Sequence, residues 1–283
     1  MNGFFNRPEA KYRARMAMRD VYPHPMLVTL AYVALTSWLV MALTYLVANP
    51  FSIALPYLAA GYEAADVLLY IFTPGRVGAY LLMQLLIVLY QWVMQYGYMA
   101  YALGLARHTG PGYRTLLEGF SHIGRALGVS FFTALFTFLW GMLAMVPYLV
   151  VLTLGALMQS YVIIMLSTVL ALIGVAVEIM VSYRYRLATY FLLDDPDMTA
   201  LSAIRESKGT MAGRKGALFV MDLSFLGWGL LSLFTFGIVG LWAIPYMWAT
   251  EVNFYHWARW GAFPGDSAGG SQPGGYQSPY QNL

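Results

Sequence analysis

The chain has 283 residues, of which 60% are hydrophobic and only 10% charged, and its mean hydropathy is +0.61. One soluble core cannot bury that much apolar surface, so the composition favours a protein whose solvent is largely lipid. The formal net charge is only +3, and there is no cysteine. The absence of cysteine excludes disulfides, thiol nucleophiles and cysteine-based zinc sites.

Residues 1–25 form a basic juxtamembrane segment, which we expect to be a short helix at the membrane surface. An apolar run at about 26–48 follows and predicts a first transmembrane span, which is too long for the core of a signal peptide. Residues 49–76 are expected to form a loop. The cations of the first segment are Arg7, Lys11, Arg13, Arg15 and Arg19.

Five further apolar segments predict transmembrane helices, which together with the first make one domain over 26–260. Each has about the 20 residues that a bilayer crossing needs. Pro147 lies inside the third span and is expected to kink or break it. The acidic sequence from Asp194 to Asp197 resembles the start of a soluble helix. The predicted spans after the first are about 78–105, 126–155, 160–183, 217–234 and 238–258.

The span at 78–105 has two opposite faces. Gly97, Ala100 and Gly104 lie on one side, which should pack closely against another element. Three glutamines project from the other side. They could line a hydrophilic path or hydrogen-bond to neighbouring helices, and the absence of charge on that face favours hydrogen bonding.

The last two spans form a hairpin with an acid near each end. Its apolar run, Leu218 to Trp257, has twice the length that one crossing needs, and a turn is expected at Thr235–Gly237. Asp222 and Glu251 should therefore lie side by side at one depth.

The distribution of cations predicts the orientation. Every Lys and Arg except Arg76 falls in the two terminal segments or in alternate connectors, and by the positive-inside rule both termini are cytoplasmic. Residues 261–283 are rich in Gly, Ser, Gln and Pro and are predicted to be a disordered cytoplasmic tail. The expected fold class is therefore all-α: a polytopic transmembrane helical bundle of about six spans.

Several short features cluster between residues 206 and 257: Ser207 with Met211 and Gly213, Phe219–Asp222, Ser224-Phe225 with Trp228, Gly237–Trp242, Pro245-Tyr246 and Phe254-Tyr255. In these features the chain resembles the DUF975 family of bacterial integral membrane proteins, over about residues 10–260. The resemblance implies a multi-span protein of a bacterial plasma membrane. Because the family has no established activity, it implies no catalytic residues.

Three acids lie within predicted spans, where a charge costs about 2.5–3.5 kcal/mol and needs a partner or a cavity. Glu178, Asp222 and Glu251 are each a similar number of positions from a cytoplasmic cation, so they lie at a similar depth. With Arg184 or Arg186 as a counter-charge, they form a candidate intramembrane polar site. The site could be a cytoplasm-facing cavity for a cation or a proton-coupled substrate. The alternative is ion pairing between helices near the interface.

Two basic segments provide candidate contacts with anionic lipid headgroups. Arg214 and Lys215 precede the span at 217–234, where the helix dipole and free backbone N–H groups favour an anion. Arg15 and Arg19 would be attracted to an anionic membrane surface. The alternative for both segments is that they serve only as topology determinants.

Signatures of catalysis are absent: the sequence has no GxSxG elbow and no HExxH motif. We therefore expect no enzymatic activity, no cofactor and no metal. The expected function is that of a membrane scaffold, or a stress or immunity factor, acting through lipid or protein partners and without nucleic acid. The alternative is a small transporter or channel-like protein that uses the three acids.

Overall fold

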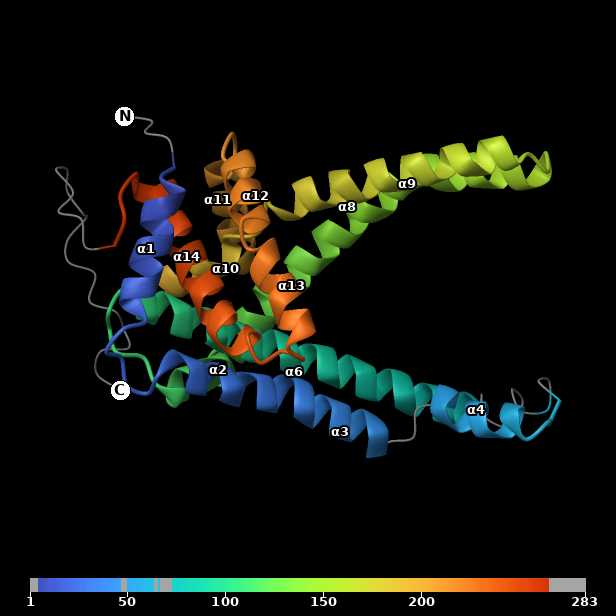
Figure 1. The fold of residues 1–283 in the computed structure, drawn as a ribbon, viewed down its shortest axis with the longest axis horizontal. Coiled ribbons are helices and arrows are strands. Elements are labelled where there is room, and N and C mark those ends of the chain that lie inside the picture. Colours follow the sequence, from blue (N-terminus) through green and yellow to red (C-terminus); the bar gives the residue numbers. More distant parts are fainter. Residues whose placement is uncertain (1–4, 47–49, 64–65, 67–72, 265–283) are drawn as a thin grey trace.

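The computed structural model describes residues 5–46, 50–63, 66 and 73–264, and the regular elements in this part of the chain are all helices. A compact body lies at one end of the molecule, and two helical arms project from it and diverge (Figure 1). The prediction of an all-α protein is therefore confirmed for the described residues.

The first arm pairs the first and second predicted spans in antiparallel fashion (Figure 1). The helix of the first span continues through a π turn, and the Tyr90 hydroxyl of the neighbouring helix donates to the Leu35 carbonyl within that turn, at 3.1 Å. Because a π turn shifts the regular hydrogen-bond ladder, it exposes such a carbonyl to a neighbour. The elements are α2 (Pro25–Val33), the π turn (Ala34–Trp38), α3 (Leu39–Leu46) and α6 (Pro74–Ala106).

The segment between the first two spans was expected to be a loop, and this is wrong for its first part. Residues Pro50–Ala59 form helix α4, with Pro56 inside it. Residues 47–49, 64–65 and 67–72 of the expected span end and loop lie outside the described residues.

The second arm is a long hairpin of α8 (Ile123–Leu157) and α9 (Tyr161–Ser182). Glycines let the two helices approach closely: a Cβ atom on Gly174 would lie 3.0 Å from the Ala144 carbonyl oxygen. Helix α8 continues past Pro147, so the proline does not break it. Helix α9 packs against α8, and such a neighbour can stabilise a helix that lacks one backbone hydrogen bond.

The last two predicted spans form the expected hairpin. Helix α13 (Leu226–Phe234) ends where predicted, and α14 (Gly240–Trp260) begins after a turn in which Phe236 and Gly237 have φ angles of 51° and 87°. Helix α12 (Lys215–Leu223) precedes α13 and is separated from it by a short break at Ser224 and Phe225.

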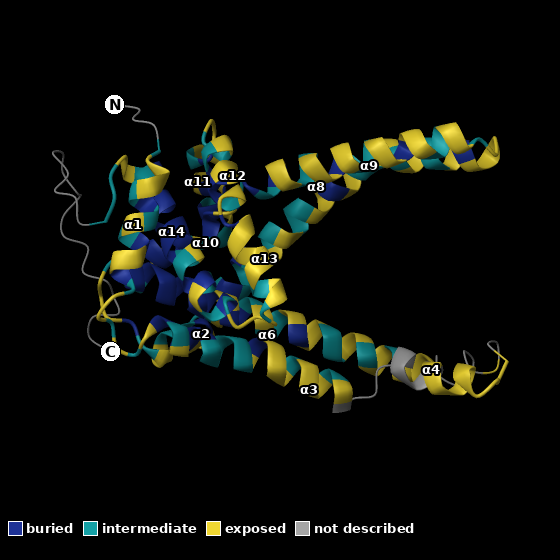
Figure 2. Ribbon diagram, viewed as in Figure 1, coloured by how far each residue is buried: buried dark blue, intermediate teal, exposed yellow. Residues whose placement is uncertain are grey.

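The buried core lies in the body, whereas the arms are largely exposed (Figure 2). Its centre is α14, which is buried from Ala249 to Tyr255 and contacts α1 (Arg7–Ala17), α2 and α6. The body also contains η2 (Tyr113–Leu117), α7 (Glu118–Ser121), α10 (Ala188–Asp194) and α11 (Ala200–Thr210).

The small face of α6 packs closely, as predicted, but against the connector that follows it. A Cβ atom on Gly97 would lie 2.0 Å from the Leu116 carbonyl oxygen, and one on Gly104 would lie 2.9 Å from Oγ1 of Thr109. On the opposite face, the Gln84 amide donates to the Tyr80 hydroxyl of the same helix at 2.7 Å. Hydrogen bonding is thus the role that the structure gives to this amide.

Five helical stretches among the described residues are long and apolar enough to cross a membrane, so the chain is a membrane protein by the length and composition of its helices. They lie at the positions of the first five predicted spans. Helix α14, at the position of the sixth, is not among them: it is long enough, at 21 residues, but polar residues such as Asn253, His256 and Arg259 lower its mean hydropathy. The five stretches are Pro25–Tyr45, Pro74–Ala106, Ile123–Leu157, Tyr161–Ser182 and Lys215–Phe234.

Candidate functional site

The structure brings two of the three predicted acids together in the body. Asp222 on α12 and Glu251 on α14 line one cavity together with a cation, Arg186, in the turn between α9 and α10. The candidate residue Arg184 does not line this cavity. We call this group of side chains the body pocket.

Arg186 and Glu251 form a bidentate ion pair. The Arg186 Nε and Nη2 atoms donate to Oε1 and Oε2 of Glu251 at 3.0 and 2.7 Å. The Glu251 side chain is only 5% exposed, so its charge has little access to water. Its negative charge raises the pKa of Arg186, against the opposing effect of burial. The parallel donors of a guanidinium suit a carboxylate that has lost its hydration.

Asp222 is held by a different partner. The Tyr183 hydroxyl donates to Oδ2 of Asp222 at 2.9 Å. The break between α12 and α13 turns Phe225 toward the same cavity, one helical turn after Asp222.

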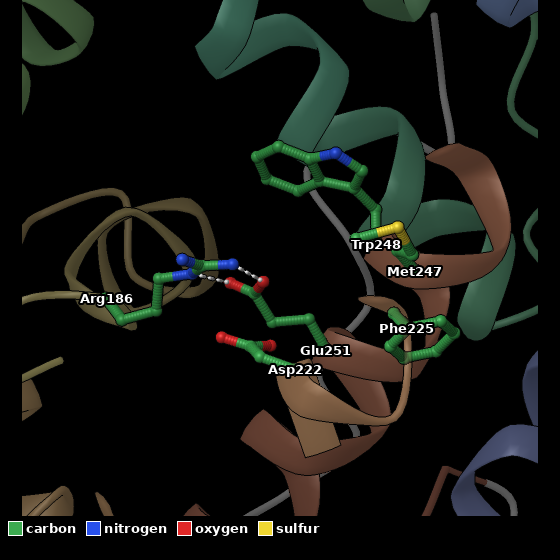
Figure 3. A pocket seen from close by; sticks show the side chains of 6 residues that line it. All are labelled: Arg186, Asp222, Phe225, Met247, Trp248 and Glu251. Atoms are coloured by element: carbon green, nitrogen blue, oxygen red, sulfur yellow. Dashed lines mark hydrogen bonds and ion pairs between the residues drawn. The ribbon is translucent and has the colours of Figure 1, made fainter. Parts of the chain in front are cut away.

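The cavity has a volume of about 80 Å³ and one polar and one apolar side (Figure 3). The two carboxylates point toward Arg186, while the apolar side chains lie on the opposite side (Figure 3). At about 10–15 Å³ per water in this measure, the space would hold roughly five to eight waters or a small solute. The lining residues are Arg186, Asp222, Phe225, Met247, Trp248 and Glu251.

Tyr190 on α10 is a further polar residue of the body, within range of the charges of Glu251 and Arg186. Its side chain is fully buried, and its hydroxyl has no hydrogen-bond partner among the described residues. Burial, and then the charge of Glu251, raises the pKa of Tyr190 well above 10. A buried hydroxyl without a partner is costly, but Tyr190 does not line the pocket, so this capacity lies in the core beside it.

Glu178 and Arg184 lie against α8, so the expectation that Glu178 faces the other two acids is corrected. A Cβ atom on Gly141 would lie 3.1 Å from Oε1 of Glu178, and the Arg184 guanidinium lies 5.6 Å from the centre of the Trp140 ring. Counting residues from the cytoplasmic cations estimated the depth of Glu178 but not the direction in which it points.

A second charged cluster was missed by sequence reasoning. Asp194, predicted to begin a helix, ends α10 in the core, where Arg107 Nη1 lies 2.7 Å from its Oδ1. Arg259 Nη1 and the Tyr255 hydroxyl donate to its Oδ2 at 2.9 and 2.6 Å. The Nε2 atom of His256 accepts from Arg107 Nε at 3.1 Å. The signal available in the sequence was the apolar run that leads into Asp194, which is typical of a buried helix end.

The candidate lipid contacts differ in their surroundings. Arg15 and Arg19 are exposed in α1 and just after it. Arg214 and Lys215 are half-buried, and Arg214 Nη1 donates to the Thr210 carbonyl at 2.6 Å. Helix α1 is also part of the body: its Ala10, Ala14 and Ala17 are buried, against the expectation of a helix that only lies on the membrane.

The contact between α1 and α14 includes a specific hydrogen bond. The Asn253 side-chain amide on α14 donates to the Ala10 carbonyl at 2.9 Å. Because both groups are buried, the bond fixes α1 in register with α14.

These features define an all-α membrane protein with a packed body, two apolar arms and a small charged pocket. The chain belongs to the DUF975 family: the family model described as "Protein of unknown function (DUF975)" matches residues 5–259. Comparisons with curated proteins and with solved structures gave no match.

Proposed function

We propose that this protein is a non-enzymatic scaffold of a bacterial plasma membrane, with both termini in the cytoplasm, that acts through lipid and protein partners. The orientation is supported by the distribution of cations. Exposed Arg15 and Arg19, with Arg214 and Lys215, are the proposed contacts with anionic headgroups. A reporter fused after Tyr62 is expected to read as external, and a cytoplasmic signal there would overturn this topology.

The observation that carries the scaffold proposal is the pairing of two buried acids, Glu251 and Asp194, with arginines from other elements. Arg186 joins the turn after α9 to α14, and Asp194 joins the ends of α6, α10 and α14. Such pairs fix the relative positions of helices, because breaking one leaves an uncompensated buried charge. A body held in this way presents the two arms at a defined angle to lipid and to partners.

The scaffold proposal can be tested by replacing the Arg186–Glu251 pair with apolar residues. The double variant Arg186→Met with Glu251→Leu keeps the packing and removes both charges. A scaffold should then still complement a strain that lacks the gene, for example in growth under membrane stress, in proportion to the amount of folded protein. Loss of complementation by a folded double variant would contradict a purely structural role.

The body pocket favours a second candidate function, that of a small transporter. Its cavity reaches Asp222 and Glu251, two acids near the cytoplasmic ends of predicted spans. Flux of a cation into proteoliposomes is the direct test. Flux that is lost in Asp222→Asn but retained in Glu178→Gln would support transport through the pocket, whereas no flux above empty liposomes would exclude it for the cations used.

A further inference from the structure

We propose that the body pocket binds an alkylammonium group, carried by a small organic cation or by a lipid headgroup. The inference concerns the same site as the second candidate function and names its ligand class. It requires binding only, so it stands whether or not the ligand crosses the membrane.

The charge of the pocket selects a cation. Among the residues that line the cavity, Arg186 contributes one positive charge, and Asp222 and Glu251 contribute two negative charges when ionised. Both oxygens of Glu251 accept hydrogen bonds from Arg186, so that pair is internally neutral. Among the described residues, the side chain that donates to Asp222 is the neutral Tyr183 hydroxyl, so Asp222 carries the excess charge when it is ionised. A cation next to Asp222 would neutralise it.

The apolar side of the pocket selects an organic cation. Phe225, Met247 and Trp248 lie opposite the carboxylates (Figure 3). Aromatic faces attract alkylammonium groups, which expose methyl or methylene groups around their charge, and a thioether fits the same surface. A cavity of about 80 Å³ matches an ammonium head of a few heavy atoms.

The aromatic walls are held in place before any ligand binds. Tyr98 contacts the Trp248 ring edge to face at 5.8 Å between ring centres, and Tyr246 contacts Phe225 in the same way at 5.2 Å. Walls that do not have to be ordered on binding lower its entropic cost.

The protein itself already places an ammonium on one of these rings. The Lys11 Nζ atom of α1 lies 4.2 Å from the centre of the Phe225 ring and donates to the Ser224 carbonyl at 3.4 Å. This contact shows that a face of the Phe225 ring can bind an alkylammonium group, which at this face belongs to Lys11 itself.

The same ligands are poorly suited to a metal ion. A hard cation such as Ca²⁺ needs about six to eight oxygen ligands, and the two oxygens of Glu251 are occupied by Arg186. Among the described residues, no group of three or more His, Cys, Asp or Glu side chains could hold a metal ion. The geometry therefore favours an ammonium group over an inorganic cation.

The test is calorimetric titration of the full chain, purified in dodecyl maltoside, with tetramethylammonium chloride against sodium chloride at equal ionic strength. Saturable binding of tetramethylammonium alone is expected. Asp222→Asn should weaken it about tenfold through the lost charge, and Trp248→Leu about fivefold through the lost cation–π contact. Phe225→Leu is the second wall variant in case Trp248→Leu fails to fold.

The matched control is Glu178→Gln, which neutralises an acid on α9 outside the pocket and should leave the affinity unchanged. Equal responses to tetramethylammonium and sodium, or wild-type affinity in folded Asp222→Asn and wall variants, would overturn the proposal. If binding is present but proteoliposomes show no flux, the transporter function fails and the site stands.

Nanodiscs distinguish the two sources of the ammonium group. If the natural ligand is a headgroup, phosphatidylethanolamine should compete with tetramethylammonium and weaken its apparent affinity relative to phosphatidylglycerol. If the ligand is a solute, the affinity should be the same in both lipids. Either result supports an ammonium site, and the absence of binding in both contradicts it.

Discussion

Several charged residues of the body form ion pairs, and this determines how much stability the protein loses when one of them is replaced. Glu251 is only 4% exposed, so removing its partner leaves a carboxylate that water cannot reach. Arg186→Met should therefore lower the free energy of unfolding by about 1–3 kcal/mol, below the range for a fully buried pair because the Arg186 side chain is 42% exposed, whereas the double variant Arg186→Met with Glu251→Leu should lose much less. Denaturant unfolding followed by circular dichroism measures both. A double variant no more stable than the single one would contradict the pairing.

Asp194 should be as sensitive as Glu251, because it faces Arg107 and Arg259 together. Asp194→Asn keeps the shape of the side chain but removes the charge that balances two guanidinium groups. Because the cations are then unpaired, the free energy of unfolding should fall by about 2–4 kcal/mol. Asp197→Asn, at an exposed position three residues further on, is the matched control and should change stability by less than about 0.5 kcal/mol. Similar losses in the two variants would mean that the Asp194 cluster contributes no special stability.

Glu118 gives the body a pH dependence. It lies in α7, outside the predicted spans, and burial raises the pKa of its carboxyl from 4.5 to about 7. The folded state therefore retains a proton that the unfolded state loses, so stability should fall as pH rises from about 4.5 to about 7 and then level off. Melting temperatures of the wild type and Glu118→Gln across this range provide the check, and an equal slope in both would assign the effect to other groups.

At the scale of elements, α6 and the connector after it interlock through two glycines. A Cβ atom on Gly97 would lie 2.0 Å from the Leu116 carbonyl oxygen, and one on Gly119 would lie 2.0 Å from the Val93 carbonyl oxygen. Both contacts are with backbone, which cannot rotate away as a side chain can. The two elements must therefore separate if either glycine gains a side chain.

Gly97→Ala and Gly119→Ala should each destabilise the body by about 1–3 kcal/mol or more, the range for overpacking a core. Gly78→Ala is the control: it lies in the same helix as Gly97, has open space around it, and should be neutral or stabilising by up to about 1 kcal/mol. Thermal unfolding in detergent compares the three. Equal effects of Gly78→Ala and Gly97→Ala would show that helix propensity, and not the close contact of Gly97 with Leu116, determines the change in stability.

The sequence predicted elements better than it predicted partners. The turn at Thr235–Gly237 and the small face of α6 were recognised because each depends on local spacing. The partners of Asp194 could not be found in this way, because Arg107 and Arg259 lie 87 and 65 positions away in the chain. Likewise, Arg184 and Arg186 are equivalent in spacing, and only the packing of α14 against the turn after α9 selects Arg186 for Glu251.

At the scale of the whole molecule, long helices connect two environments. Helices α6 and α8 have 33 and 35 residues, about 50 Å each at 1.5 Å per residue, and exceed the hydrocarbon thickness of about 30 Å. The body contains the excess length of α6, which is buried from Tyr96 to Leu103. We infer that the arms lie in lipid and that much of the body lies at the membrane surface.

Two exposed leucines test this division. Leu172, near the middle of α9, is 67% exposed, and Leu201, on α11 in the body, is 47% exposed. If the arm lies in lipid, Leu172→Arg places a charge near the bilayer centre at a cost of about 2.5–3.5 kcal/mol, whereas Leu201→Arg places one in water at little cost. The fraction of protein that resists alkaline carbonate extraction should fall for Leu172→Arg and remain at the wild-type level for Leu201→Arg. Equal extraction of the two variants would mean that the exposed surfaces of the arm and of the body face the same solvent. That result would contradict the placement of the arms in lipid and of the body at the membrane surface.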